Sequence, residues 1–564
     1  MKKSIFTLVI ALSALFTGCQ DLDLNPLTEG SSENWFSTEA EFQMAVNELY
    51  RETYWYWETT RFNNTDRFSD DYNQRDYLYD WLQGNLTSET GSVEACWRSN
   101  YSGVTRANSI LVNVERARRE GSISEPLLQR FEGEAAFFRA CFYSYLVFLW
   151  GDVPFYTDYI YLKDALGMGR TDKSVVLKQI YADFDTAIAN LQPSYSGAVR
   201  VTQGTAYAFK ARTAIWMLDW ETAADAAGKC MELKTYSLHP DYADLFLSKT
   251  RTSPEWIFTL PRSKELTGSA DATKSRLPRL AGGNATCQPS WELLFAYLCT
   301  DGKPVDESPL FDPSHPFANR DPRCTATMVE FGTEFLDYIF DPSAKEVMRV
   351  STGKMVKNND SRLVQQYAAF NGMCLKKGVD EEWTDDMATD ADVRIMRYAD
   401  VLLMYAEAKI ELNQIDQSVR DAINALRERA YRNSGLTYPK VTETDQSKLR
   451  TILRTERRME LAWENRRWFD LIRWRLAEIA CTRPIYCHDQ TTALQKVIDS
   501  GDYPFPKGVL PEVDADGLVD LSPLYATGKI IKINDRGFQK RQYLMPIPAK
   551  ERLINPNISQ NDGY

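Results

Sequence analysis

Apolar side chains recur every three or four positions along most of the chain, which is the period of an amphipathic α-helix and not of a strand. In residues 132–150 these positions are Ala135, Phe138, Phe142, Tyr145 and Leu149. Because proline cannot continue a helix, the Gly-Asp-Val-Pro run at 151–154 predicts that this helix ends at Trp150. Residues 173–191 repeat the pattern and stop before Pro193.

Two pairs of consecutive helices carry small residues at helix–helix contact spacing. The first pair spans residues 203–218 and 221–233, and the second spans residues 395–412 and 418–431. Alanines at these positions let two antiparallel helices approach closely, which is typical of tetratricopeptide-like repeats. The pattern predicts a mainly α scaffold of degenerate helical hairpins, interrupted between the two pairs.

The interrupting segment, about residues 262–392, has a different composition. It is rich in Gly, Pro, Asp and Ser, with short strand-like runs such as residues 325–331. Such composition predicts loops and short hairpins, which often carry binding function on a rigid scaffold. A second loop-rich stretch covers residues 484–541.

The N-terminal residues have the pattern of a lipoprotein signal peptide. Lys2 and Lys3 precede an apolar run, residues 5–16, that is too short to span a bilayer and closes on Thr-Gly-Cys19. We expect residues 1–18 to be removed and Cys19 to carry lipid, with simple secretion as the alternative. Phe16 departs from the leucine that is usual before such a cleavage site.

Charge and composition exclude several partners and chemistries. The formal net charge of −12 argues against nucleic acid and against an anionic bilayer surface. The cysteines after Cys19 include no Cys-x-x-Cys pair, so we expect small buried residues, with a bridge between Cys481 and Cys487 as the alternative. Gly-x-Ser-x-Gly, a phosphate-binding loop and His-Glu-x-x-His are all absent from the sequence. We therefore predict neither cofactor nor metal. Calcium at the acidic runs 380–392 or 514–517 is a less favoured alternative to solvated loops.

The densest motif is Thr-Glu-Arg-Arg-Met-Glu-Leu-Ala-Trp-Glu-Asn-Arg-Arg-Trp-Phe-Asp-Leu-Ile-Arg-Trp at 455–474. On one continuous helix, Arg457 would pair with Glu460 and Glu464 with Arg467 at i, i+3 spacing. Glu460 and Glu464 could instead serve as the acid and base of a glycosidase. We favour a structural ion-pair network, because the arginines would keep both carboxylates ionised.

Aromatic and polar residues are interleaved near the N-terminus. Residues 54–57 read Tyr-Trp-Tyr-Trp, and an Asp-Asp-Tyr-Asn-Gln-Arg run, Trp81 and a Trp-Arg-Ser-Asn run at 97–100 follow. A sugar ring stacks its apolar face on an aromatic plane and offers hydroxyls to Asp, Asn and Arg, so this mixture fits saccharide binding. Ordinary packing of a helix beneath a loop is the alternative.

Several segments resemble, in order, those of the SusD/RagB family of outer-membrane lipoproteins. They include the Cys19 region, residues 133–154, the Asn-Arg-Asp-Pro-Arg run at 319–323, residues 397–408, the 455–474 motif and the tail from Met545 to Asn561. The resemblance implies one SusD-like domain over residues 19–564. Its helical repeat scaffold would cover about 40–260 and 393–480, and residues 262–392 would form a loop-rich, partly β variable half.

The resemblance also implies a function. Members sit on the outside of the outer membrane as a lid over a SusC-like TonB-dependent transporter, and they usually bind an oligosaccharide or polysaccharide without catalysing a reaction. Asp21 and Asp23 resemble the family's surface-export signal. The implied ligand contacts are Asp71, Arg75, Trp97, Asn100, Trp291 and Tyr297, with Trp383 as a further candidate. Alternatives are a structural lid with little glycan affinity of its own, in an importer of peptides or other nutrients, and, least favoured, a glycosidase.

Overall fold

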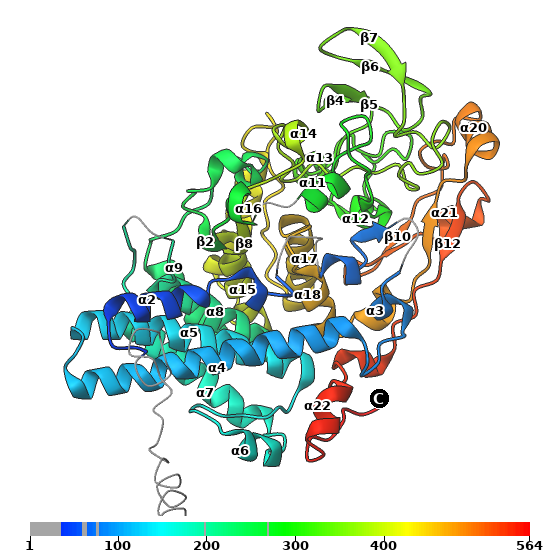
Figure 1. The fold of residues 1–564 in the computed structure, drawn as a ribbon. Helices are drawn as coiled ribbons and strands as arrows, with labels where there is room; N and C mark the ends of the chain where they lie inside the picture. Colours follow the sequence, from blue (N-terminus) through cyan, green and yellow to red (C-terminus); the bar gives the residue numbers. More distant parts are fainter. Residues whose placement is uncertain (1–34, 59–64, 75–77, 197–198, 268–269) are drawn as a thin grey trace, which may run out of the picture.

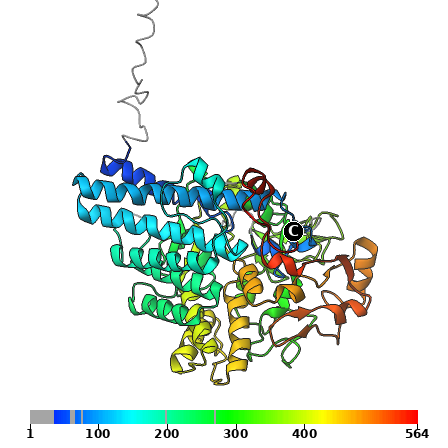
Figure 2. The same cartoon turned by 90° about the horizontal axis from the view of Figure 1, so that it is seen from below.

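Long antiparallel helices stack side by side through the first half of the chain (Figures 1 and 2). The computed structural model describes residues 35–58, 65–74, 78–196, 199–267 and 270–564. The stack runs in the order α4 (Gly91–Glu120), α5 (Glu125–Trp150), α7 (Lys173–Asn190), α8 (Gln203–Met217) and α9 (Trp220–Glu232), each packed on the next. The predicted helical-hairpin scaffold is confirmed.

Capping residues set the ends of these helices close to where the sequence places them. The Asp172 side chain accepts a hydrogen bond from the Ser174 backbone N–H (2.8 Å) and begins α7, and Thr202 begins α8 in the same way. Gly151 ends α5 with a φ of 76°, a conformation that glycine adopts without strain.

The scaffold continues after the interruption. Helix α9 packs against α15 (Tyr398–Glu411), which is followed by α16 (Gln417–Tyr431) and α17 (Gln446–Glu460). The predicted helix at 395–412 begins instead with a strand, β8 (Val393–Arg397), which pairs antiparallel with β2 (Trp256–Leu260). This pair closes the base of the 262–392 segment, because β2 enters it and β8 leaves it.

The 262–392 segment is built from short elements, as predicted. Its main sheet is antiparallel and joins β4 (Thr333–Phe335), β5 (Tyr338–Phe340), β6 (Glu346–Arg349) and β7 (Lys354–Lys357). The strand expected at 325–331 is wrong: residues 323–327 form α13 (Arg323–Thr327). The Asp321 carboxylate accepts from the Arg323 backbone N–H (3.0 Å) and also binds its guanidinium, which starts a helical turn there.

The remaining elements are short. The helices are α2 (Glu39–Glu48), α3 (Asp80–Gln83), α6 (Leu162–Gly167), α10 (Lys264–Thr267), α11 (Ala270–Arg276), α12 (Trp291–Ala296), α14 (Trp383–Asp386), α18 (Arg467–Arg473), α19 (Ala477–Ala480), α20 (Thr491–Asp499), α21 (Ser522–Ala526) and α22 (Ala549–Ile554). The strands are β1 (Tyr72–Gln74), β3 (Cys287–Pro289), β9 (Ile485–Cys487), β10 (Glu512–Val513), β11 (Val519–Asp520) and β12 (Ile531–Asn534), paired as β1–β3, β9–β12 and β10–β11. Within the described ranges, no helix is both long and apolar enough to cross a membrane.

The 455–474 motif is not one helix. Helix α17 ends at Glu460, Trp463 and Asn465 take positive φ values of 61° and 60°, and α18 begins at Arg467. The predicted i, i+3 pairs are therefore wrong, and the charges of the motif pair with residues far away in the sequence.

These long-range ion pairs are buried. The Glu460 carboxylate accepts from Arg323 (2.9 Å), Arg397 (2.7 Å) and Arg429, and Glu464 accepts from Arg397 (2.6 Å) and Lys377 (2.6 Å). Burial opposes ionisation, but these cations lower the pKa of both carboxyl groups. Both carboxylates are thus engaged in buried ion pairs, as the favoured structural interpretation of the motif expects.

All nine cysteines of the described chain are buried and unbridged, Cys481 and Cys487 included. The preferred interpretation of the cysteines as small buried residues is confirmed.

We predict that Glu460→Gln destabilises the protein by about 3 to 5 kcal/mol, because it leaves three buried arginines without their shared carboxylate. The midpoint of thermal unfolding should fall by several degrees. Glu428→Gln, an exposed position on the neighbouring helix α16, is the matched control and should leave the midpoint unchanged. Equal midpoints for the two variants would contradict the role given to this network.

Candidate functional site

A solvent-open hollow of about 240 Å³ lies where the N-terminal segment meets the start of α4. We call it the aromatic hollow. The polar and aromatic side chains around it are Tyr56, Arg67, Tyr79, Asp80, Trp81, Thr90 and Ser92. Tyr56, Arg67, Tyr79 and Asp80 are partly exposed, so a ligand can reach them.

The rings of the aromatic hollow are held by direct contacts. The Arg67 guanidinium lies 4.5 Å from the centre of the Tyr79 ring, and the Tyr79 hydroxyl donates to Gln74 (2.9 Å). Trp81 packs edge-on against Trp468 of α18, with 4.9 Å between ring centres. The hollow is therefore built on the 455–474 motif and is not a free loop.

Its chemistry suits a ring that has one apolar face and a polar edge. Tyr56 and Tyr79 offer aromatic surface, while Arg67 and Asp80 offer a donor and an acceptor. The indole N–H of Trp81 is buried, and no group of the described residues accepts a hydrogen bond from it.

Buried carboxylates fix the chain on either side of η2 (Asp66–Phe68). Asp70 binds Arg467 through two hydrogen bonds (2.8 and 3.0 Å), and Asp66 accepts from the Asn465 backbone N–H (3.0 Å). The two arginines near Asp70 lower its pKa, whereas burial raises the pKa of Asp66 to about 7. For Asp66, desolvation outweighs the backbone hydrogen bond from Asn465 and the influence of Lys377 and Arg466.

A second hollow, of about 430 Å³, lies between α4, α6 and α22. Trp97 and Tyr101 of α4 form its inner wall, and Tyr156 stacks on Tyr101 with 13° between ring planes. Its remaining wall is largely aliphatic and includes Ile160, Leu162, Leu166, Ile554 and Ile558. We call it the α6–α22 groove.

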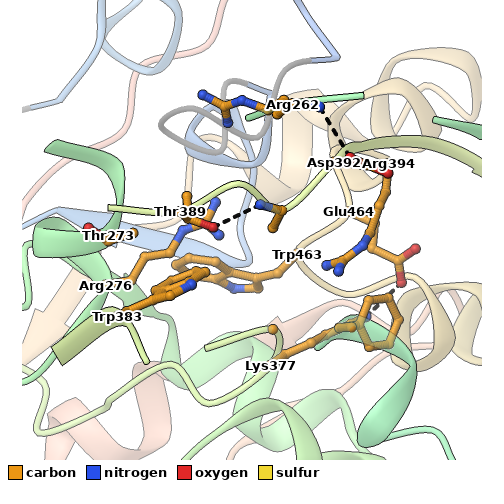
Figure 3. Close-up of a pocket in the computed structure, with 13 residues that line it drawn as sticks. Arg262, Thr273, Arg276, Lys377, Trp383, Thr389, Asp392, Arg394, Trp463 and Glu464 are labelled. Atoms are coloured by element: carbon orange, nitrogen blue, oxygen red, sulfur yellow. Dashed lines mark hydrogen bonds and ion pairs between the residues drawn. The ribbon is translucent and has the colours of Figure 1, made fainter. Parts of the chain in front are cut away.

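A third cavity, of about 60 Å³, lies between the helical scaffold and the 262–392 segment (Figure 3). Figure 3 shows Arg276, Trp383 and Trp463 on one side of it, and Arg394, Glu464 and Lys377 on the other. The Lys377 ammonium pairs with Glu464 at 2.6 Å, and Arg262 donates its backbone N–H to Asp392 at 3.1 Å. The space suits a few water molecules and is far smaller than either of the two hollows.

No cluster of three or more metal-ligating side chains occurs in the parts of the chain that the structure describes. In the 514–517 run, the Asp514 carboxylate accepts from the backbone N–H groups of Asp516 and Leu518 (both 2.9 Å), and Asp516 pairs with Arg454. The first two contacts are those of a tight turn, and the ion pair joins that turn to α17.

Two family models match the chain in succession. The model described as "Starch-binding associating with outer membrane" matches residues 24–215, and the SusD family model matches residues 254–564, more than half of the chain. The chain belongs to the SusD family. The fold, the quoted motifs and the match agree on this assignment.

Known relatives of this SusD-family protein cover most of its length. A SusD-like protein of Formosa agariphila is 29% identical over 399 residues, which is 68% of this chain and 70% of the relative. A SusD-like carbohydrate-binding protein of Bacteroides fragilis has a solved structure that superposes with a TM-score of 0.76, at 26% identity, covering 93% of this chain and 99% of that one. A structure determined with xylogluco-oligosaccharide superposes with a TM-score of 0.62 at 19% identity, covering 92% and 97%, and shows the shared fold.

Of the described residues proposed from the family resemblance, Trp97 and Asn100 lie on α4, whereas Asp71 lies next to the start of α12, where the Ser290 backbone N–H donates to the Asp71 carbonyl (3.2 Å). Trp97 is buried and lines the α6–α22 groove, whereas the Asn100 amide, one turn further along α4, donates to the Cys96 carbonyl (2.8 Å). Asp71 is buried and binds Arg458 at 2.6 Å. Arg75 and Cys19 lie outside the described residues.

The proposed aromatics of the variable half are also engaged within the protein. The Trp291 indole N–H donates to the Asn371 carbonyl (2.8 Å), and the Tyr297 hydroxyl donates to Thr327 (2.8 Å). Trp383 is buried beside the third cavity. A ligand would reach these rings only after their present contacts opened, and their binding role stays a prediction.

Arg67, Tyr79 and Asp80 of the aromatic hollow were missed by sequence reasoning. They fall inside the aromatic and polar stretch at 54–100 that the sequence singles out. No spacing in the stretch shows which of its rings remain partly exposed, because that depends on Trp468 and the other packing partners from α18.

The raised pKa of Asp66 predicts a pH-dependent stability. The folded chain binds this proton more tightly than the unfolded chain, so the cost of burying Asp66 is absent below about pH 4 and grows to its full value above about pH 7. Asp66→Asn removes this cost, on the order of 4 kcal/mol at most, and keeps an acceptor for the Asn465 N–H.

Thermal unfolding of both proteins at several pH values checks this. The midpoint of the variant should match that of the wild type near pH 4 and exceed it increasingly up to pH 8. Asp421→Asn, an exposed carboxylate on α16, should show no such trend. A constant difference across the pH range would contradict the raised pKa.

Proposed function

We propose that this protein is a non-catalytic saccharide-binding protein that captures an oligosaccharide or polysaccharide in the aromatic hollow. The observation that carries the proposal is the combination there of the partly exposed Tyr56 and Tyr79 with Arg67 and Asp80. Tyrosine faces supply stacking, and the polar groups select hydroxyl positions. Affinity at one such site should be modest, because desolvation of hydroxyl groups offsets much of the gain.

Two comparisons support a saccharide as the ligand. The Bacteroides fragilis relative is described as carbohydrate-binding, and one neighbour of the same fold was determined with xylogluco-oligosaccharide. The ionised state of Glu460 and Glu464 speaks against a glycosidase, since no raised pKa supplies a general acid there.

The proposal includes a place and a partner. Cys19 would anchor the mature chain to the outer membrane, facing the cell exterior, and the protein would cover a SusC-like TonB-dependent transporter that imports the captured glycan. The match to a family described as associating with the outer membrane supports this location. A structural lid of a peptide or other nutrient importer, with little glycan affinity of its own, is the second candidate.

We predict that Tyr79→Ala weakens oligosaccharide binding about tenfold or more, because it removes a stacking face and frees Arg67 from its contact. The measurement is calorimetric titration of the chain from residue 20 onward, which keeps every described residue, against neutral plant and host oligosaccharides and peptides. Tyr525→Ala is the matched control, since Tyr525 is 43% exposed in the second loop-rich stretch, and it should bind as the wild type does.

The other outcomes separate the alternatives. Binding that survives Tyr79→Ala but is lost in Tyr156→Ala would move the site to the α6–α22 groove. Heat only from peptides, or none from the whole panel, would favour the structural lid. Slow release of shorter sugars from the oligosaccharide during the titration would instead favour the glycosidase hypothesis.

The proposed lipid anchor at Cys19 leads to a separate prediction. Cells producing the full chain should incorporate labelled palmitate into it, and Cys19→Ser should abolish both the label and the recovery of the protein with outer membranes. Labelling that persists in Cys19→Ser would contradict lipidation at this residue.

A further inference from the structure

A fourth hollow, of about 660 Å³, opens between the loop that joins α16 to α17 and two nearby turns. Its walls are the segment 439–443 of that loop, the turn at 301–304, one side of α17 and the turn between β10 and β11. We call it the 439–443 hollow. It is larger than the aromatic hollow and the α6–α22 groove. None of the described residues that line it is aromatic, so it offers no ring on which a sugar could stack.

The backbone of the segment 439–443 is held on one side in the way a strand is held. The Asn424 side chain on α16 accepts a hydrogen bond from the Val441 N–H (2.8 Å) and donates one to the Val441 carbonyl (3.0 Å). A neighbouring strand would bind both groups of one residue in the same way. Because successive N–H and C=O groups of an extended chain point to opposite sides, those of Lys440 and Thr442 point away from Asn424.

The opposite edge of this segment is open. Lys440 and Thr442 are exposed, and no described residue makes a hydrogen bond with the backbone N–H or C=O group of either. An open edge of this kind is a template on which another extended chain can pair. A peptide offers N–H and C=O groups at the matching spacing, and many peptides bind proteins as one added strand. The open edge therefore favours a peptide as the ligand of the 439–443 hollow.

The charges around the hollow favour a basic ligand. Three carboxylates lie on its walls: Asp301, Glu443 and Asp514. The ion pairs of Glu443 and Asp514 within the protein are long, at 3.5 and 3.6 Å, so both carboxylates can bind a further cation. Of the two cations on the walls, Arg427 is buried and already pairs with Glu456 (2.8 Å), which leaves Lys440 against the three carboxylates. A ligand with ammonium groups would balance this excess of negative charge.

The hollow is closed at one end. A Cβ atom added to Gly302 would lie 2.7 Å from the Cβ of Pro439, so the turn at 301–304 and the segment 439–443 are in direct contact there. An extended chain cannot pass through this contact. A ligand must therefore end beside Asp301, which favours a short peptide over the middle of a long polymer.

We infer that the 439–443 hollow binds a short basic peptide, which pairs with the backbone of Lys440 and Thr442 as an added strand. Its ammonium groups lie beside the three wall carboxylates, and its apolar side chains pack on Leu298, Ile452 and Val513. This site is separate from the aromatic hollow, and the inference does not depend on the saccharide proposed to bind there.

Matched synthetic peptides test the inference on the unaltered chain from residue 20 onward. The probe is acetyl-Lys-Thr-Val-Thr-Lys-amide, and the control replaces both lysines by glutamates. In calorimetric titration we expect the lysine peptide to bind at least about tenfold more tightly than the glutamate peptide, with a difference that shrinks at high salt. N-methylation of the central valine and N-methylation of both threonines block opposite edges of the peptide. Exactly one of the two should weaken binding about tenfold or more, because an added strand uses only one of its edges.

One substitution and hydrogen–deuterium exchange place the peptide. Thr442→Pro removes one N–H of the open edge and should weaken binding of the lysine peptide about tenfold, whereas Thr442→Ala keeps the N–H and should retain most of the binding. In the wild-type chain, the lysine peptide should slow exchange in fragments that cover residues 437–445.

Four results would overturn the inference. They are no binding of the lysine peptide at millimolar concentration, equal binding of the lysine and glutamate peptides, equal effects of the two N-methylations, and protection by the lysine peptide that spares residues 437–445. An oligosaccharide that protects residues 437–445 in place of the peptide would also overturn it and would assign the hollow to a sugar. The peptide comparisons use the wild-type chain, so they decide the matter even where Thr442→Pro fails to fold.

Discussion

The guanidinium of Arg397 is buried between the carboxylates of Glu255, Glu460 and Glu464, at 2.6 to 2.7 Å from each. A buried charge is costly unless it is paired and hydrogen-bonded, so these four side chains must assemble together or not at all. Glu255 directly precedes β2, Arg397 ends β8, Glu460 ends α17 and Glu464 lies between α17 and α18, so the network joins segments that are distant in the sequence. Two cations of the 262–392 segment bind the same network: Arg323 pairs with Glu460, and Lys377 pairs with Glu464. These ion pairs join that segment to the helical scaffold.

The same motif also holds the candidate site. Arg458, Arg466 and Arg467 extend from it to Asp71, Glu58 and Asp70, and Trp468 supports Trp81. The aromatic hollow is thereby fixed before a ligand arrives. Such preorganisation reduces the entropy lost on binding, which matters for a site that offers only a few rings and polar groups.

The period of the apolar residues was enough to place the scaffold helices, because each buries one face against its neighbours. The same period gave wrong elements where a few long-range contacts override the local preference for helix or strand. The 455–474 motif has the composition of one helix, yet long-range ion pairs break it at Glu460, and the bond between Asp321 and Arg323 turns an expected strand into α13.

The exposure of single side chains was harder still to predict. Trp291 and Tyr297 are aromatic residues suited to a binding platform but are buried in the core, whereas Tyr79 stays partly exposed on Phe68, which itself packs on Trp468. The spacing of residues in one sequence does not show which aromatic rings are buried and which stay exposed.

The central claim is that a rigid, already formed aromatic hollow captures a saccharide. Hydrogen–deuterium exchange, with and without a saturating oligosaccharide, tests this most directly. The account predicts slower exchange confined to peptides that cover Tyr56 or residues 65–92, with unchanged exchange in α6, α22 and the 455–474 motif. Protection that is strongest in the 262–392 segment, or exchange changes across the 455–474 motif, would show that the ligand binds elsewhere or that the site forms only on binding, and would contradict the account.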